Sequence, residues 1–194
     1  MEDIFYNHQN FDGDIYVADY TEFAKVHCEK NGIGVVISDK EPEEIASLTF
    51  INPNKVPVLA VNFENNEAIF RLVGKEKVSN CECMLVSRQG SKNRWVALAE
   101  LKYCKGEDTN IIRNFETALI QLRETFLYLR DKKHIFDSQT YRFFWIISMP
   151  EHNERIPFGA FFFSQDERTE YKNTYGVNII DDNVVKIWTG TVLR

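Results

Sequence analysis

The sequence predicts a mixed α/β (α+β) fold, in which helices flank a central sheet of parallel and antiparallel strands. Between Val56 and Tyr103, apolar residues recur in short strand-like runs separated by polar turns. From about residue 108 the apolar spacing becomes helical, and the apolar run at residues 142–150 then returns to a strand pattern. No repeat, low-complexity tract or linker interrupts the chain, so we expect residues 1–194 to form a single domain.

The N-terminal quarter of the chain carries one clear helix signal. Residues 1–15 show no regular pattern. A helix is predicted over about Tyr20–Lys30, with Thr21 as its N-cap and Asn31-Gly32 as its end.

Strand patterns then dominate as far as residue 103. Residues 33–38 form a short apolar strand, and a turn of helix is expected from Pro42. The later segments share apolar runs that end at polar turns, and strands are predicted over residues 56–63, 67–73, 80–86 and 94–103.

The second half of the chain opens with its strongest helix signal. Asp108 or Thr109 is the expected cap, and apolar residues follow at helical spacing: Ile111, Ile112, Phe115, Ala118, Leu119, Leu122, Phe126 and Leu129. Residues 142–150 have the continuous apolar character of a strand buried on both faces. A strand over 159–164, a helix over 165–174 and a hairpin of 177–180 with 184–188 complete the prediction.

Two carboxylates and a lysine stand on neighbouring predicted strands. Glu100 and Lys102 project from the same face, because successive side chains of a strand alternate. If the two strands pair as a hairpin across residues 88–93, a suitable register places Glu82 beside Glu100. An acidic pair next to an ammonium group is what a phosphodiesterase that uses a divalent metal requires.

The same three residues also have a plain structural interpretation. Glu100 and Lys102 would then be an ion pair on a solvent-facing ladder, which contributes little to stability. Val96 and Leu98 share the face of Glu100, so this face begins apolar and becomes ionic at its end. That pattern favours a cleft.

Composition and short motifs exclude several classes of protein. The net charge of −6 argues against a broad nucleic-acid coat, although basic residues at 88–94 and 123–133 leave room for a local basic groove. No apolar run is long enough to cross a bilayer and no signal peptide is recognisable, so we expect a cytoplasmic protein with reduced cysteines. Cys81 and Cys83 are expected on one face of a strand, where they cannot form a disulfide. The motifs G-x-S-x-G and G-x-G-x-x-G are absent.

The order of the predicted elements resembles the common core of the PD-(D/E)xK nuclease superfamily, the restriction-endonuclease-like fold. The similar order is strand, strand with an acid, strand with E-x-K, long amphipathic helix and buried strand, over about residues 56–150. The remaining N-terminal and C-terminal segments would be extensions of that core. Glu82-Cys83-Met84-Leu85-Val86 corresponds to the strand of the first acid, and Glu100-Leu101-Lys102 to (D/E)-x-K. Several members carry a glutamine inside the next helix, and Gln121 lies at a comparable place.

The resemblance implies a nuclease that hydrolyses phosphodiester bonds of DNA with Mg²⁺ or Mn²⁺. The carboxylates of Glu82 and Glu100 and the carbonyl of Leu101 would be the metal ligands. Lys102 would orient the attacking water or stabilise the charge that develops on the phosphate. Gln121 would position Lys102, the water or a phosphate oxygen.

The sequence departs from the superfamily pattern at the first acid, which is usually aspartate and here is Glu82. The additional methylene moves the carboxylate by about one bond length, and Mg²⁺ demands near-ideal octahedral geometry. An acid from the first helical region often completes such sites, and Glu43 and Glu44 are both candidates.

Two alternatives to a nuclease remain at this point. The first is a catalytically inactive member of the same fold that serves as a binding or assembly module. The second is an unrelated α+β interaction protein whose aromatic segment F-G-A-F-F-F, residues 158–163, forms a dimer edge. In either case a homodimer or a protein partner is expected in place of nucleic acid, and metal binding separates both alternatives from the nuclease.

Overall fold

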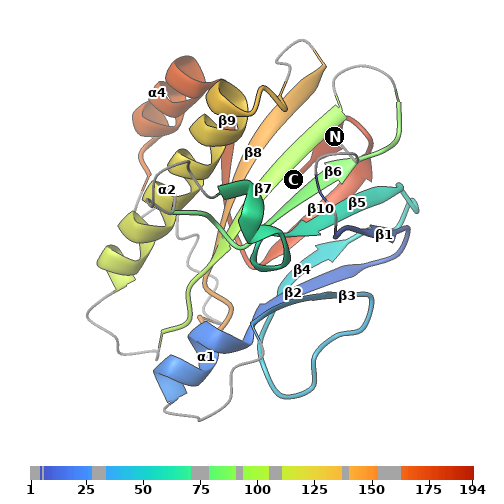
Figure 1. Ribbon diagram of the computed structural model, residues 1–194, viewed down its shortest axis with the longest axis vertical. Helices are drawn as coiled ribbons and strands as arrows, with labels where there is room; N and C mark the ends of the chain where they lie inside the picture. The colour runs from blue at the N-terminus through green and yellow to red at the C-terminus, as the bar shows by residue number, and fades with distance from the viewer. Residues whose placement is uncertain are drawn as a thin grey trace.

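The computed structural model describes residues 5, 7–27, 34–70, 79–90, 94–104, 111–136, 140–152 and 163–194. The described residues form two mixed β-sheets and the α-helices α1 (Tyr20–His27), α2 (Ile111–Leu127) and α4 (Gln165–Tyr175) (Figure 1). A mixed α+β architecture was predicted and is observed. The prediction of one central sheet was incomplete, because the strands divide between two.

The larger sheet has the strand order β1-β5-β6-β7-β8-β9. Its neighbours from β1 to β7 pair antiparallel, whereas β7, β8 and β9 are mutually parallel. Helix α2 connects the parallel strands β7 and β8. The strands of this sheet are β1 (Gln9–Phe11), β5 (Val58–Asn62), β6 (Cys83–Ser87), β7 (Arg94–Leu101), β8 (Tyr141–Ser148) and β9 (Val177–Asp181).

The smaller sheet has the strand order β11-β10-β4-β2-β3. Only β10 and β4 pair parallel within it. Its strands are β2 (Ile15–Asp19), β3 (Val35–Ser38), β4 (Leu48–Ile51), β10 (Val184–Thr189) and β11 (Val192–Leu193). Strands β1, β2, β4 and β11 were missed from the sequence, because strands this short give a weak periodic signal.

The six-stranded sheet is covered on both faces. One face packs against α2, α4 and the 3₁₀ helix η1 (Glu64–Phe70), where aromatic side chains such as Phe70, Phe126 and Trp145 form the core. The opposite face packs against the five-stranded sheet through small and branched side chains such as Ala97 and Ala99. Figure 1 shows α2 and α4 together beside β8. Strand β8 is buried on both faces from Phe143 onward, as its continuous apolar run predicted.

The C-terminal strands exist but do not form the predicted hairpin. Strand β9 pairs with β8, whereas β10 pairs with β4 and β11 in the other sheet. The side chain of Asn183 holds the connection: its Oδ1 accepts hydrogen bonds from Ser148 Oγ and Met149 N, each at 2.8 Å. Its backbone carbonyl accepts from Thr49 N at 2.9 Å. Asn183 therefore fastens the chain where it passes from one sheet to the other.

Two further local predictions were wrong. Residues 67–70 of the strand predicted over 67–73 belong to η1, and residues 71–73 lie outside the described residues. Asn66 Nδ2 donates to Asn62 O at 2.8 Å, and Asn62 Oδ1 accepts from Glu64 N at 2.9 Å. These side-chain bonds compete with strand pairing. Residues 41–47 contain no helical turn.

The α-helices of the described residues occur where they were predicted, and the expected end of the first helix at residues 30–32 lies outside the described residues. Asp19 caps α1, since its Oδ1 accepts hydrogen bonds from Thr21 N at 2.9 Å and Glu22 N at 3.1 Å, so the choice of Thr21 was wrong. Helix α2 continues into a π-helical turn, η2 (Tyr128–Lys132). Ser164 and Glu167 form a capping box at the start of α4. The caps predicted at residues 108 and 109 and most of the strand predicted over 159–164 lie outside the described residues.

None of the helices in the described part of the chain combines the length and the apolar character needed to span a membrane.

Candidate active site

Glu100 and Lys102 lie together at the end of the buried strand β7. Lys102 Nζ is 2.6 Å from Glu100 Oε1, and the side chains are 10% and 0% exposed, respectively. A backbone hydrogen bond from Lys102 N to Ser148 O, at 2.9 Å, keeps the chain aligned with β8 beyond the end of β7. Glu100 Oε2 is buried and has no hydrogen-bond partner among the described residues. A carboxylate oxygen in this position is available to a ligand.

Glu82 lies near Glu100: burial, followed by the negative charge of Glu100, raises the pKa of Glu82. The regular ladder of β6 and β7 ends at the pair of Cys83 with Ala99, so Glu82 comes directly before β6 and is not a paired residue of that ladder. Glu82 N donates to Ala99 O at 3.1 Å, and Glu82 O accepts from Phe63 N at 3.0 Å. These backbone bonds hold the half-buried Glu82 between β5 and β7.

Burial and mutual repulsion favour the protonated forms of both carboxyl groups. Burial raises the pKa of Glu100 from 4.5 to about 7, although the ammonium group of Lys102 opposes the increase. Burial, followed by the negative charge of Glu100, raises the pKa of Glu82 well above its usual value. Burial by itself lowers the pKa of Lys102, but Glu100 outweighs it and the net pKa is raised. Lys102 therefore remains charged near neutral pH.

The carbonyl of Leu101 faces the Glu82 side of β7. In a trans peptide unit the N–H and C=O groups point in opposite directions. Lys102 N points toward Ser148 on β8, so the carbonyl of Leu101 points toward β6. The carbonyl of Ala99 has the same direction, since it accepts from Glu82 N.

Gln121 supports the segment before Glu82 and makes no hydrogen bond to Lys102 within the described residues. Its Nε2 donates to Asn80 O at 3.3 Å, and its Oε1 is buried without a described partner. One turn later on α2, Thr125 Oγ1 accepts from Cys81 N at 2.8 Å. Helix α2 thus positions the chain that leads into β6.

The cysteines beside Glu82 were assigned wrongly to one face of the strand. Cys81 packs in the core beneath α2, whereas Cys83 packs against the five-stranded sheet. The strand begins only at Cys83, so the alternation of faces does not extend to Cys81. Both thiols and that of Cys104 are free and buried, and burial raises the pKa of Cys81 and Cys83 well above the usual value.

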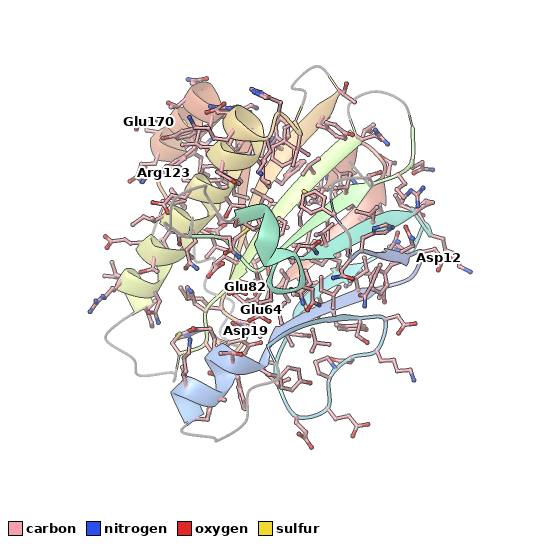
Figure 2. The ribbon with its side chains drawn as sticks, in the orientation of Figure 1. Asp12, Asp19, Glu64, Glu82, Arg123 and Glu170 are labelled. Atoms are coloured by element: carbon pink, nitrogen blue, oxygen red, sulfur yellow. The ribbon has the colours of Figure 1, made fainter. Side chains whose placement is uncertain are left out.

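Further carboxylates that the sequence did not single out lie around the same position. Asp19 and Glu64 are close enough to raise the pKa of Glu82, and Asp19 and Glu22 act similarly on Glu100. Figure 2 shows Asp19, Glu64 and Glu82 in one region, between η1 and the start of α1. The expected upstream acids, Glu43 and Glu44, are instead exposed.

Each of these additional carboxylates already serves the fold. Asp19 is 3% exposed and caps α1, and burial raises its pKa although those backbone hydrogen bonds oppose the shift. Glu64 Oε2 accepts from Val35 N at 2.8 Å, and Glu22 pairs with Lys25 at 2.7 Å. An acid directly after an apolar strand, as in I-Y-V-A-D at residues 15–19, is the sequence signal that could have identified Asp19.

The carboxylates of the site determine whether it could bind a metal ion. In the described parts of the chain, no group of three or more His, Cys, Asp or Glu side chains is arranged to hold a metal ion. Glu82 and Glu100 supply two carboxylates, and the unpartnered Glu100 Oε2 suits a hard cation. The pKa of about 7 for Glu100 would also suit proton transfer by that carboxyl group near neutral pH.

The basic residues proposed as a groove lie away from this acidic site. Arg94 is six residues before Glu100 on β7, about 20 Å away along the strand. Its Nη2 donates to Tyr141 OH at 2.9 Å, and Arg88 Nη1 donates to Asn10 Oδ1 at 2.8 Å. Lys92 lies outside the described residues. Within the described residues, Lys102 pairs with Glu100, and Lys25 pairs with Glu22.

Comparison with protein-family models, with curated proteins and with solved structures gives no match for this chain. Its chemistry is therefore inferred from the residues themselves.

Proposed function

We propose that the protein is a metal-dependent nuclease of the PD-(D/E)xK type that hydrolyses phosphodiester bonds of DNA. The observation that carries the proposal is the proximity of Glu82 to Glu100 at the end of the ladder of β6 and β7, with Lys102 paired to Glu100 at 2.6 Å. A fully buried carboxylate and a lysine at the end of a core strand are costly to desolvate, which favours a functional role over a surface ladder.

The arrangement of the strands supports the same proposal. Strands β5, β6 and β7 form an antiparallel meander, α2 follows, and β8 adds parallel to β7. This is the element order on which the resemblance to the restriction-endonuclease-like core depends. The acid directly before β6 and the E-x-K sequence at the end of β7 lie near each other, which is compatible with that resemblance.

The residues present are compatible with Mg²⁺ or Mn²⁺. Glu82, Glu100 and the carbonyl of Leu101 would hold the cation, because hard divalent ions accept one or two carboxylates and keep several waters. When bound, such an ion lowers the pKa of a coordinated water and offsets charge on the scissile phosphate. Glu100 would have to release the proton that burial favours before it could act as a ligand.

The remaining roles follow from the contacts of each side chain. The Lys102 ammonium group is held beside Glu100, where it would stabilise the negative charge that develops on the phosphate or orient the attacking water. Gln121 would act as a positioning residue for the Glu82 segment through Asn80 O. Water would attack phosphorus, the bond from phosphorus to the leaving oxygen would break, and that oxygen would take up a proton.

Cleavage of supercoiled plasmid and of single-stranded DNA in Mn²⁺ tests the proposal. We expect Glu100→Gln and Lys102→Met to lose activity by about a hundredfold or more, since each removes a group that acts on the transition state. Glu116→Gln is the matched control, because Glu116 is an exposed glutamate on α2. Wild-type protein without cleavage, or full activity in both site variants, would refute the assignment; circular dichroism verifies that each variant is folded.

One observation favours the second candidate, a catalytically inactive binding or assembly module of the same fold. The site lacks a third carboxylate arranged for a metal within the described residues, and its lysine already pairs with Glu100. In that case the wild-type protein would neither bind Mn²⁺ nor cleave DNA, and Glu100 and Lys102 would serve the fold alone.

A further inference from the structure

A pocket of about 610 Å³ opens between the edges of the two sheets, and neither Glu82 nor Glu100 lines it. Its walls are the edge strands β1 and β3, on the right of Figure 1 with β3 below β1, and the strand β5. Among the described residues, none that lines the pocket carries a formal charge when His8 is neutral; the polar groups come from Asn7, His8, Gln9, Asn62 and Asn65. Such a surface suits a neutral ligand with many hydrogen-bonding groups.

The backbone of β3 has hydrogen-bonding groups that face this pocket. Val35 N and Val35 O do not bond to β2: they are taken by Glu64 Oε2 at 2.8 Å and Asn62 Nδ2 at 2.6 Å. Strand β2 pairs with β3 on one side only, and the direction of the backbone groups alternates along a strand. The N–H and C=O of Ile37, two residues after Val35, therefore also point away from β2.

The pocket lies where the five-stranded sheet ends at β3 and the six-stranded sheet ends at β1. Ala60 of β5 faces the five-stranded sheet, and Gln9 of β1 is its direct cross-strand partner. Directly opposed residues project from the same face of a sheet. Gln9 is exposed, and its amide makes no hydrogen bond to another described residue. A strand added beside β3 would lie over Gln9 and Ala60.

We propose that β3 is a docking edge for an extended peptide segment of a protein partner. The segment pairs with Ile37 N–H and C=O as an additional strand of the five-stranded sheet. Its inward side chains are small and uncharged, because they lie over Ala60 and between neutral amides. Gln9 binds a peptide group of the segment, and the capping of Val35 by Asn62 and Glu64 ends the pairing at that residue.

Selection from a displayed library of random dodecapeptides tests the proposal. Ile37→Pro removes the pocket-facing N–H while leaving the β2 ladder intact, since proline is tolerated at the outward position of an edge strand. Ile37→Ala is the control, because it keeps the N–H and loses the side chain. We expect recovered peptides to bind wild-type protein and the alanine variant, and to lose about tenfold or more in affinity for the proline variant.

Amide hydrogen exchange supplies a readout that needs no substitution. In the free protein the Ile37 amide should exchange faster than those of its neighbours Val36 and Ser38, which face β2, and a selected peptide should protect it. A library that yields no peptide dependent on the Ile37 N–H overturns the proposal. So does protection of that amide in the free protein by self-association, or protection by a mononucleoside instead of a peptide. DNA cleavage should be unaffected by Ile37→Pro, so this test and that of the nuclease can fail separately.

Discussion

Substitution of Glu100 by glutamine should change how stability depends on pH. The Glu100 side chain is fully buried, and burial raises its pKa from 4.5 to about 7. Glutamine has nearly the same shape and keeps an oxygen for Lys102, but it cannot titrate. The pKa of Lys102 is raised, so its charge does not change in this range.

The sign and size of the effect follow from the pKa difference. Between pH 4.5 and about 7 the folded protein keeps a proton on Glu100 that the unfolded chain has released. The contribution of Glu100 to the free energy of unfolding is therefore fully present below pH 4.5 and is lost as pH rises through about 7. This difference in pKa corresponds to a loss of about 3 kcal/mol in the free energy of unfolding. The Glu100→Gln variant does not show this loss, because glutamine does not titrate.

Urea unfolding in chelator, followed by fluorescence of the buried Trp95 and Trp145, measures this difference. Relative to wild type, the free energy of unfolding of Glu100→Gln should increase by about 3 kcal/mol between about pH 4.5 and about pH 8. Glu116→Gln, an exposed control, should follow the wild-type profile. If the free energies of unfolding of wild type and Glu100→Gln change in parallel with pH, the pKa of Glu100 is not raised. If Glu100→Gln instead loses stability relative to wild type as pH rises, the positive charge of Lys102 lowers the pKa of Glu100 more than burial raises it.

Three further predictions concern the surroundings of the site. Asp19→Ala should lower the free energy of unfolding by about 1 kcal/mol through loss of the α1 cap, whereas Asp19→Asn should retain it; equal losses would show that the cap is unimportant. Thr125→Val should cost about 1–3 kcal/mol in urea unfolding, because Cys81 N loses its buried acceptor, and the exposed Thr117→Val is its control; equal effects would contradict the bond to Cys81. Cys81 and Cys83 should resist alkylation by iodoacetamide until the protein unfolds, as mapped by mass spectrometry, and rapid labelling of the native protein would contradict their burial.

The hairpin of the site could be predicted from sequence because its signals are local and consistent. Residues 83–87 and 94–101 run largely apolar on either side of a polar turn, which predicts the antiparallel pairing that brings Glu82 near Glu100. Helix α2 was equally clear, because its apolar stripe repeats at helical spacing.

The errors arose where distant partners decide the structure. Strands β9 and β10 have the sequence pattern of a hairpin, but β9 pairs with β8 and β10 pairs with β4 in the other sheet. The hydrogen bond from Met149 N to Asn183 Oδ1 fixes the segment that connects β9 and β10. The role of Asp19 as a cap beside Glu82 depends on how the two sheets meet, which no local pattern encodes. The pocket between β1 and β3 also depends on how the two sheets meet, so the sequence did not predict it.

Calorimetric titration of Mn²⁺ into metal-free protein at about pH 6 and about pH 8 tests the central claim most directly. If Glu82 and Glu100 hold the cation, it must displace a proton that Glu100 binds with a pKa of about 7. Affinity should then be about tenfold higher at the higher pH, with release of protons and with loss of binding in Glu100→Gln. Absence of saturable binding at either pH, or binding unchanged in Glu100→Gln, would contradict a metal site at the paired carboxylates.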